Sequence, residues 1–432
     1  MKKVTLKISF AILCGLFFNI NQAQNPTPAK PQSQKRAIVN ANIHTGTGQI
    51  IENGCLVFEG GKILAIGKTG EISTTGAEIT DAKGQEVYPG FIAANTYLGL
   101  NEIEMVRSTL DYVEVGNINP NVRSLIAFNT DSRIISTLTV NGILEAQIVP
   151  QGGTISGSSS VVQLDAWNWE DAAIKTDGAI HINYPDLGPY RGRNPEGAKN
   201  FETYQQNQLN AIQEFMQTAR AYCKEQKHLA INLKYEAMRP VFNGQRNLFV
   251  HVNYVKGIIH AINFFNSMNL KITLVGGSDS WMVTDLLKQS ETAVVLSQVH
   301  ALPGYPQDDV DLPFKIPYLL DQAGIPFCLS VAGNWQVRNL PFMAGTAAAF
   351  GLGKEKALKA ITQSAANILG VGATTGSLQP GKDATFFISK GDALDMAGNQ
   401  VIEAYIQGRK IELTNTQIQS FQKYSTKYGI GK

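Results

Sequence analysis

The chain has 432 residues, of which 44% are hydrophobic and 17% are charged, and its formal net charge is +2. This composition suffices for a large buried core, and the near-neutral charge gives no electrostatic reason to expect a nucleic-acid or anionic-membrane partner. We therefore expect a small-molecule ligand or substrate.

The first residues have the pattern of a secretory signal. Lys2, Lys3 and Lys7 precede an apolar run from Ile8 to Ile20, which is too short to span a membrane well. We predict a cleaved signal peptide over residues 1–23, an exported protein that is periplasmic or extracellular, and no membrane insertion after cleavage. Removing three lysines changes the formal charge from +2 to 2 − 3 = −1.

Both ends of the mature chain predict one small β domain. Residues 24–35 are rich in Pro and Gln and predict a flexible linker. Residues 36–86 read as short strands separated by glycine turns, and residues 371–413 offer matching strands, so we expect the two parts to form a β-sandwich together. Residues 414–432 are left as a C-terminal tail.

Residues 87–370 between these parts alternate strand-like apolar runs with helical periodicity, as βα units do. The fold class that we predict is α/β, a TIM-like (β/α)8 barrel with the small β domain attached. The Gly/Ser-rich segment Gln151–Ser160 predicts a mobile or tightly turning loop, either facing a substrate or lying plainly on the surface. The predicted strands are Tyr88–Ile92, Gly142–Ala146, Ala179–Asn183, Leu229–Leu233, Leu248–Val252, Leu270–Val275, Thr292–Leu296 and Pro326–Ser330, and the predicted helices include Phe201–Lys224, Val255–Ser267 and Lys354–Leu369.

Three stretches together resemble the amidohydrolase superfamily, in particular its imidazolonepropionase-like group. Residues 81–92 (DAKGQEVYPGFI) resemble the family's entry into its barrel, and residues 357–370 (ALKAITQSAANILG) are similar to its closing helix. Residues 376–384 (GSLQPGKDA) resemble the return to the β domain. The resemblance implies a barrel whose mouth holds one or two divalent ions that activate a water for hydrolysis.

The metal ligands that the resemblance implies are mostly missing. Asn95 and Tyr97 stand where the family has a His-x-His pair at the end of the first strand. Gly276 replaces the sixth-strand histidine, and the eighth strand, which ends near Asn334, has no aspartate. Only His251, on the fifth strand, matches well, and catalytic zinc normally needs three protein ligands. We therefore expect no metal and no cofactor, unless a rearranged site binds zinc.

Other residues at predicted strand ends can still form a site. His251 is either a catalytic residue or a histidine that is simply hydrogen-bonded in the barrel mouth. Neutral histidines and carboxylates within hydrogen-bond reach can share acid/base chemistry. His181 is predicted to be structural or on the surface. The candidate catalytic residues are His251, Asp279, Glu236, Lys234 and His300, and the candidate substrate-binding residues are Asn95, Tyr97 and Arg338.

Two functions remain open from the sequence. The first is an exported hydrolase that acts on carbon–nitrogen bonds other than peptide bonds, with a degenerate metal site. The alternative is a catalytically inactive relative that binds a ligand or supports an active partner subunit, and the protein can be a homo- or hetero-oligomer. A third arrangement, a rebuilt metal site from Glu236, His251, Asp279 and His300, requires these side chains to converge on one point.

Overall fold

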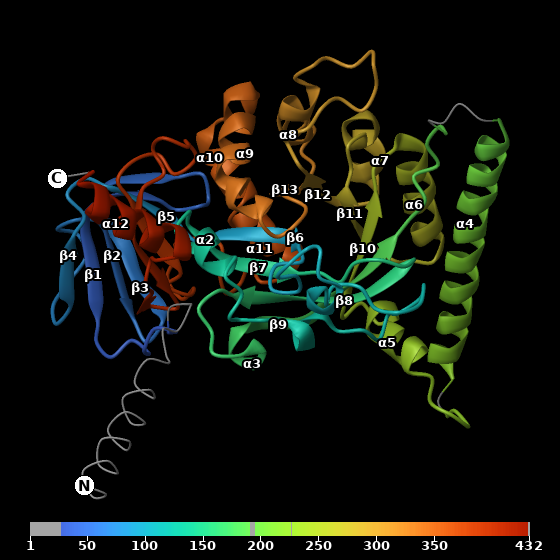
Figure 1. Cartoon of the computed structure of the whole chain (residues 1–432), viewed down its shortest axis with the longest axis horizontal. Helices are drawn as coiled ribbons and strands as arrows, with labels where there is room; N and C mark the ends of the chain where they lie inside the picture. Colours follow the sequence, from blue (N-terminus) through green and yellow to red (C-terminus); the bar gives the residue numbers. More distant parts are fainter. Residues whose placement is uncertain (1–26, 191–194, 226, 431–432) are drawn as a thin grey trace, which may run out of the picture.

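The computed structural model describes residues 27–190, 195–225 and 227–430. The predicted signal peptide lies outside these residues. A closed barrel of eight strands lies beside a separate sheet, as Figure 1 shows. The fold class predicted from the sequence is confirmed, with one departure in the barrel.

The barrel contains strands in the order β10-β11-β12-β13-β6-β7-β8-β9. The order places β9 beside β10 and closes the circle through β13 and β6. The bounds are β6 (Phe91–Thr96), β7 (Ile143–Ile148), β8 (Ile155–Gln163), β9 (Ala173–Asn183), β10 (Asn247–Val252), β11 (Ile272–Gly276), β12 (Ala293–Ser297) and β13 (Phe327–Ser330).

The departure is β8, which pairs antiparallel with both β7 and β9. It occupies the third position around the barrel, and it includes most of the segment Gln151–Ser160 that was predicted to be a loop. That prediction was wrong because every residue of β8 is buried, where small side chains fit. At Gly157, whose φ is 134°, an added Cβ would lie 2.6 Å from the carbonyl oxygen of Val122.

The small domain is built from both ends of the chain, as the sequence predicted, and its strands belong to one eight-stranded sheet, whereas a β-sandwich was expected. Strand β5 joins the two parts, since it pairs with β1 on one side and with β14 on the other. The bounds are β1 (Arg36–His44), β2 (Ile50–Glu59), β3 (Lys62–Lys68), β4 (Glu78–Asp81), β5 (Glu86–Pro89), β14 (Phe386–Ser389), β15 (Val401–Ile406) and β16 (Arg409–Lys410).

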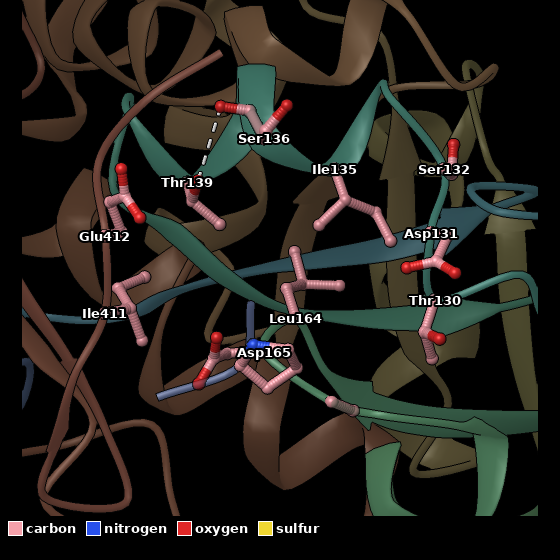
Figure 2. Close-up of a pocket in the computed structure, with 12 residues that line it drawn as sticks. Thr130, Asp131, Ser132, Ile135, Ser136, Thr139, Leu164, Asp165, Ile411 and Glu412 are labelled. Carbon is pink, nitrogen blue, oxygen red and sulfur yellow. Dashed lines mark hydrogen bonds between the residues drawn. The ribbon is translucent and has the colours of Figure 1, made fainter. Parts of the chain in front are cut away.

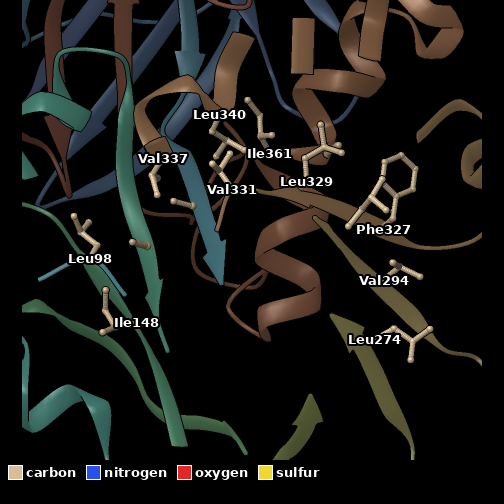
Figure 3. Close-up of a cluster of buried hydrophobic side chains, with 14 of the residues drawn as sticks. Leu98, Ile148, Leu274, Val294, Phe327, Leu329, Val331, Val337, Leu340 and Ile361 are labelled. Carbon is tan, nitrogen blue, oxygen red and sulfur yellow. The ribbon is translucent and has the colours of Figure 1, made fainter. Parts of the chain in front are cut away.

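Helices cover the outside of the barrel. Side chains that point outward from the strands, such as Leu274, Val294 and Leu329, belong to the large apolar cluster that Figure 3 draws. Among the described residues, no helix is both long and apolar enough to cross a membrane. The bounds are α2 (Ile135–Thr139), α3 (Trp169–Ala172), α4 (Pro195–Lys224), α5 (Leu233–Phe242), α6 (Val255–Ser267), α7 (Thr284–Gln289), α8 (Leu312–Gln322), α9 (Leu340–Ala347), α10 (Lys354–Ala360), α11 (Gln363–Leu369) and α12 (Thr416–Tyr428).

Two local predictions differ from the structure. Leu229–Leu233 is not a strand, because α5 begins at Leu233 behind an Asn232 side chain that accepts hydrogen bonds from the first turn. The predicted helix Lys354–Leu369 is two helices that break near Thr362. In the described part of the linker, the Ala29 N–H donates a hydrogen bond to Asp165. Most of the C-terminal tail is the helix α12.

Candidate active site at the barrel mouth

The alternation of β10 decides which of its side chains enter the barrel. Leu248, Val250 and Val252 pack outward against the helices, whereas Phe249 lies in the apolar cluster inside the barrel. Because strand side chains alternate, His251 also points inward, one residue before the carboxyl end of the strand. That end is where barrel enzymes assemble their active sites.

The same alternation places His181 beside His251. On β9, Ala179 faces the barrel interior while Ile180 and Ile182 face the helices, so His181 faces inward. His181 Nδ1 lies 2.8 Å from His251 Nε2, and His181 Nε2 lies 2.8 Å from Ser159 Oγ of β8. The prediction that His181 is a surface or structural residue missed this pair. The sequence signal that could have found it is that His181 lies two residues after Ala179, so both side chains are on the same face of the strand.

The hydrogen-bonded chain continues to the first two barrel strands. Gln147 of β7 donates from Nε2 to Ser159 Oγ at 2.9 Å, and its Oε1 accepts from the backbone N–H of Asn95 at 3.1 Å. Ser159 and Gln147 are 1% and 2% exposed, and His181 is fully buried. We call Asn95, Gln147, Ser159, His181 and His251 the mouth chain.

The donors of the mouth chain fix its direction. The backbone N–H of Asn95 can only donate, so Gln147 must place its amide oxygen toward that N–H and its NH₂ group toward Ser159. Ser159 Oγ accepts from Gln147, and we infer that it donates its own hydrogen to His181 Nε2, 2.8 Å away, because accepting from both neighbours would leave that buried hydrogen without a partner. His181 then donates from Nδ1 to His251 Nε2. This arrangement satisfies every buried donor and leaves His251 Nδ1–H without a partner among the described residues.

Both histidines are neutral at physiological pH. Burial lowers the pKa of His251 to about 4. Burial lowers the pKa of His181 well below its usual value, and a charge on His251 would lower it further. An imidazole that stays neutral can hold a carbonyl oxygen or a leaving nitrogen through its N–H.

Asn95 adds an unsatisfied acceptor at the same end of the barrel. It has a φ of 54°, lies within an irregularity in the pairing of β6 with β7, and is 8% exposed. Its Oδ1 is buried without a hydrogen-bond partner. A buried acceptor without a partner costs free energy, and a ligand that donates a hydrogen bond would recover it.

The other predicted site residues do not join the mouth chain. Lys234 and Glu236 lie on α5, where Arg239 holds the Glu236 carboxylate and lowers its pKa to about 2. Asp279 accepts from the Val255 N–H and the Tyr305 hydroxyl and so anchors the start of α6.

Three further candidates lie outside the strands and α-helices and make local contacts. His300 Nε2 is 2.7 Å from Thr346 Oγ1, and burial lowers the pKa of His300. The Arg338 guanidinium stacks over Trp335. The ring of Tyr97 lies 4.9 Å from that of Tyr112.

The residues at the mouth do not fit the metal centre that the fold family implies. The described residues contain no group of three or more His, Cys, Asp or Glu side chains that can hold an ion, so the rebuilt site from Glu236, His251, Asp279 and His300 does not form. Both nitrogens of His181 are already engaged. Gly276 has a φ of 99°, and a Cβ there would lie 2.4 Å from Asn253 Oδ1, so the backbone rejects the missing histidine.

Cavities lie near the mouth and elsewhere. One of about 80 Å³ opens between the ends of β11 and β12, lined by Ser278, Asp279, Ser297 and Gln298 among others. The pocket in Figure 2 lies between α2 and the segment around Ile411, and its volume of about 40 Å³ leaves room for roughly one water molecule. We therefore place the candidate site at the mouth chain and not at the pocket of Figure 2.

Comparisons with known proteins support the fold. An amidohydrolase from Thermotoga maritima MSB8 has a similar structure, with a TM-score of 0.76 and 22% identity over 87% of this chain and 98% of that one. Molinate hydrolase aligns at a TM-score of 0.55 and 13% identity, covering 88% of this chain and 95% of that one. A zinc-bound adenosine deaminase from Xanthomonas campestris aligns at 0.51 and 12%, covering 93% and 99%.

No family model and no curated protein matches the sequence. The chain nevertheless shares its fold with these proteins, one of which is an amidohydrolase, and the fold that the resemblance in the sequence implied is confirmed. At these identities the likeness fixes the fold and leaves the chemistry to the site.

Proposed function

We propose that the protein is an exported hydrolase of the amidohydrolase fold, which cleaves a carbon–nitrogen bond other than a peptide bond in a small molecule. The observation that carries this proposal is the chain from Ser159 through His181 to His251, which ends at the barrel mouth in a free ring nitrogen. The residues around it do not supply a metal centre, so no step of the proposal uses an ion.

The mouth chain allows His251 to act both as a hydrogen-bond donor and as a proton acceptor. In the resting arrangement, His251 Nδ1–H donates a hydrogen bond to the substrate. This bond stabilises the negative charge that develops on a carbonyl oxygen or a leaving nitrogen during the reaction. In the other tautomer of both rings, His181 donates from Nε2 to Ser159 Oγ and His251 donates from Nε2 to His181 Nδ1, so His251 Nδ1 exposes a lone pair. That lone pair can accept a proton from an attacking water, and the resulting imidazolium then passes the proton to the leaving nitrogen. That second arrangement leaves the Ser159 hydroxyl hydrogen without a partner, which costs a free energy of about 1–3 kcal/mol.

The second candidate is a ligand-binding protein without catalysis. The observation that favours it is the Oδ1 atom of Asn95, which is buried without a hydrogen-bond partner, although the buried donors of the mouth chain are already paired. A small uncharged molecule with one N–H and one C=O would complement Asn95 Oδ1 and His251 Nδ1–H without further chemistry.

One experiment separates the two. The mature protein is incubated with a panel of small lactams, cyclic ureides and N-acyl amines in the presence of a metal chelator, while amine or ammonia release and thermal stabilisation are both followed. Turnover that survives the chelator and is lost in His251→Ala supports the hydrolase. Stabilisation without turnover, also lost in His251→Ala, supports the binding protein. His300→Ala is the matched control, because His300 lies outside the mouth chain.

Neither response from any compound in the panel contradicts both proposals. Turnover that requires added zinc contradicts the metal-free mechanism alone.

A further inference from the structure

The helix α12 carries an apolar surface that nothing in the described chain covers. Phe421, Tyr424 and Tyr428 are 70%, 50% and 64% exposed, and their spacing of three and four residues places them on one face of the helix. No residue of α12 is buried. Only Ile418 and Ser425, on the adjoining edge, are partly covered. We call Phe421, Tyr424 and Tyr428 the aromatic stripe.

The charge around the aromatic stripe is of one sign. Residues 413–430 contain Lys423 and Lys427 and no Asp or Glu. Both lysines lie near the stripe, since their ammonium groups are 5.6 Å and 5.1 Å from the rings of Tyr424 and Tyr428. The helix therefore presents a basic aromatic surface.

A second exposed apolar surface lies on residues 101–118, which follow β6 at the mouth end of the barrel. We call this segment the mouth loop. It has the opposite charge, because Glu102, Glu104, Asp111 and Glu114 outnumber Arg107. Its exposed apolar side chains are Ile103 (57%), Met105 (94%), Val106 (39%), Val113 (52%) and Val115 (85%). Exposed apolar side chains that gather on one surface usually mark an interaction site.

The two surfaces cannot meet within one chain. Asn415, the N-cap of α12, donates from Nδ2 to the backbone carbonyl of Ser136 in α2, and α2 leads into the amino end of β7. The mouth loop lies at the opposite end of the strands, where Val113 pairs with Gln151 just beyond the carboxyl end of β7. Figure 1 shows α12 beside the strands of the small domain.

We propose that α12 of one copy docks on the mouth loop of a second copy of this chain. The aromatic stripe supplies apolar area to the exposed valines and Met105, and Lys423 and Lys427 face the acidic side chains of the loop. Each chain holds one helix and one loop, so the contact forms twice in a closed dimer or continues head to tail. This inference is independent of the proposed function.

Sedimentation velocity over a concentration series tests the contact on the full mature chain. The helix variant F421S/Y424S/Y428S and the loop variant M105S/V113S/V115S should each weaken self-association by about tenfold or more, because aromatic and apolar anchors dominate such contacts. Added salt should weaken the wild-type contact as well. The control is L229S/I231S, which removes exposed apolar side chains from the segment between α4 and α5.

Mixing the two variants is the decisive measurement. The helix variant keeps its loop and the loop variant keeps its helix, so an equimolar mixture should recover a complex that neither forms alone. Circular dichroism confirms that both variants fold. A wild type that stays monomeric at high concentration overturns the proposal, and so does a mixture that fails to associate while wild type does. A monomer whose α12 instead binds vesicles of anionic lipid overturns it too, in favour of a membrane surface.

Discussion

The hydroxyl oxygen of Thr375 lies 2.8 Å and 3.0 Å from the two carboxyl oxygens of Glu145, and this hydrogen-bonded contact ties the segment after α11 to the inside of the barrel. Glu145 is 1% exposed, and burial raises its pKa to about 8, although the Thr375 hydrogen bond opposes this shift. The folded protein therefore holds a proton on Glu145 that the unfolded chain, with a glutamate pKa of about 4.3, releases.

The first prediction is that stability falls as pH rises because of Glu145. The folded state binds more protons than the unfolded state between about pH 4.5 and about pH 8, so the free energy of unfolding decreases with pH in that window, by at most roughly 1.4 kcal/mol per unit. Glu145→Gln should remove this slope and unfold at higher urea concentration than wild type near pH 8. Urea unfolding from pH 4.5 to 8.5 measures it, with the exposed-loop variant Glu104→Gln as control. Parallel slopes for E145Q and wild type would contradict it.

The second prediction concerns His44, which joins the small domain to α10. Its two ring nitrogens lie 2.7 Å from Glu355 and 2.9 Å from Glu86. Burial alone would lower the pKa of His44, but the hydrogen bonds and charges of Glu355 and Glu86 together raise it. The stability that the charged ring contributes is therefore complete below about pH 6.5 and is lost as pH rises through the raised folded pKa.

His44→Gln should lower the free energy of unfolding by roughly 2–4 kcal/mol at pH 6, because both carboxylates lose a charged partner. The loss should shrink above the raised pKa. Combining His44→Gln with Glu355→Gln should restore part of the stability at pH 6, and urea unfolding of the two variants measures this. A loss in His44→Gln that does not change with pH would show that the ring acts by packing, as its stacking on Tyr88 also allows.

The barrel and the two-part sheet could be predicted from the sequence because their signals are local or paired. Strands such as β10 and β12 are short apolar runs between turns, and α6 has its buried side chains at helical spacing, with bounds that match the prediction. The two ends of the chain share a strand pattern, and β5 joins them in one sheet.

The antiparallel strand β8 could not be predicted, and it shifted the rest of the site assignment. Gly and Ser usually indicate loops, but here they let a strand buried on both faces fit between β7 and β9. Without β8, the strand Ala173–Asn183 is counted as the third, and a fourth has to be sought at Leu229–Leu233. Lys234 and Glu236 then become candidates, and His181 is passed over.

The third prediction is the tautomer of the mouth chain. His181 and His251 should both carry their single proton on Nδ1, and burial depresses both pKa values, so that His251 stays neutral down to about pH 5. Nitrogen-15 NMR of the histidine rings measures both properties, with His251→Asn to assign the signals. Ser159→Ala removes the donor that fixes the direction and should mix the tautomers. A His251 protonated on Nε2 in wild type would contradict the direction, and a transition near pH 6.5 would contradict the burial.

A depressed histidine pKa also has a consequence for stability. In the unfolded chain His251 binds a proton below about pH 6.5, whereas in the folded protein it binds one only below about pH 4. The free energy of unfolding therefore decreases as pH falls through that window. The effect runs opposite to those of Glu145 and His44, and His251→Asn should therefore make the protein more tolerant of acid in relative terms.

The fourth prediction is that restoring the family's first-strand ligands does not restore a metal centre. Asn95→His with Tyr97→His recreates the His-x-His pair, yet elemental analysis after incubation with zinc should find far less than one ion per chain.

The sixth-strand ligand is still missing, and Gly276→His should destabilise the fold by about 1–3 kcal/mol because a side chain at a φ of 99° is strained and collides with Asn253. Gly353→His is the control, since φ is 80° there but a Cβ meets no atom within 4 Å. Near-stoichiometric zinc in the double variant would mean that His181 and His251 can part and turn toward an ion, and the metal-free proposal would then fail.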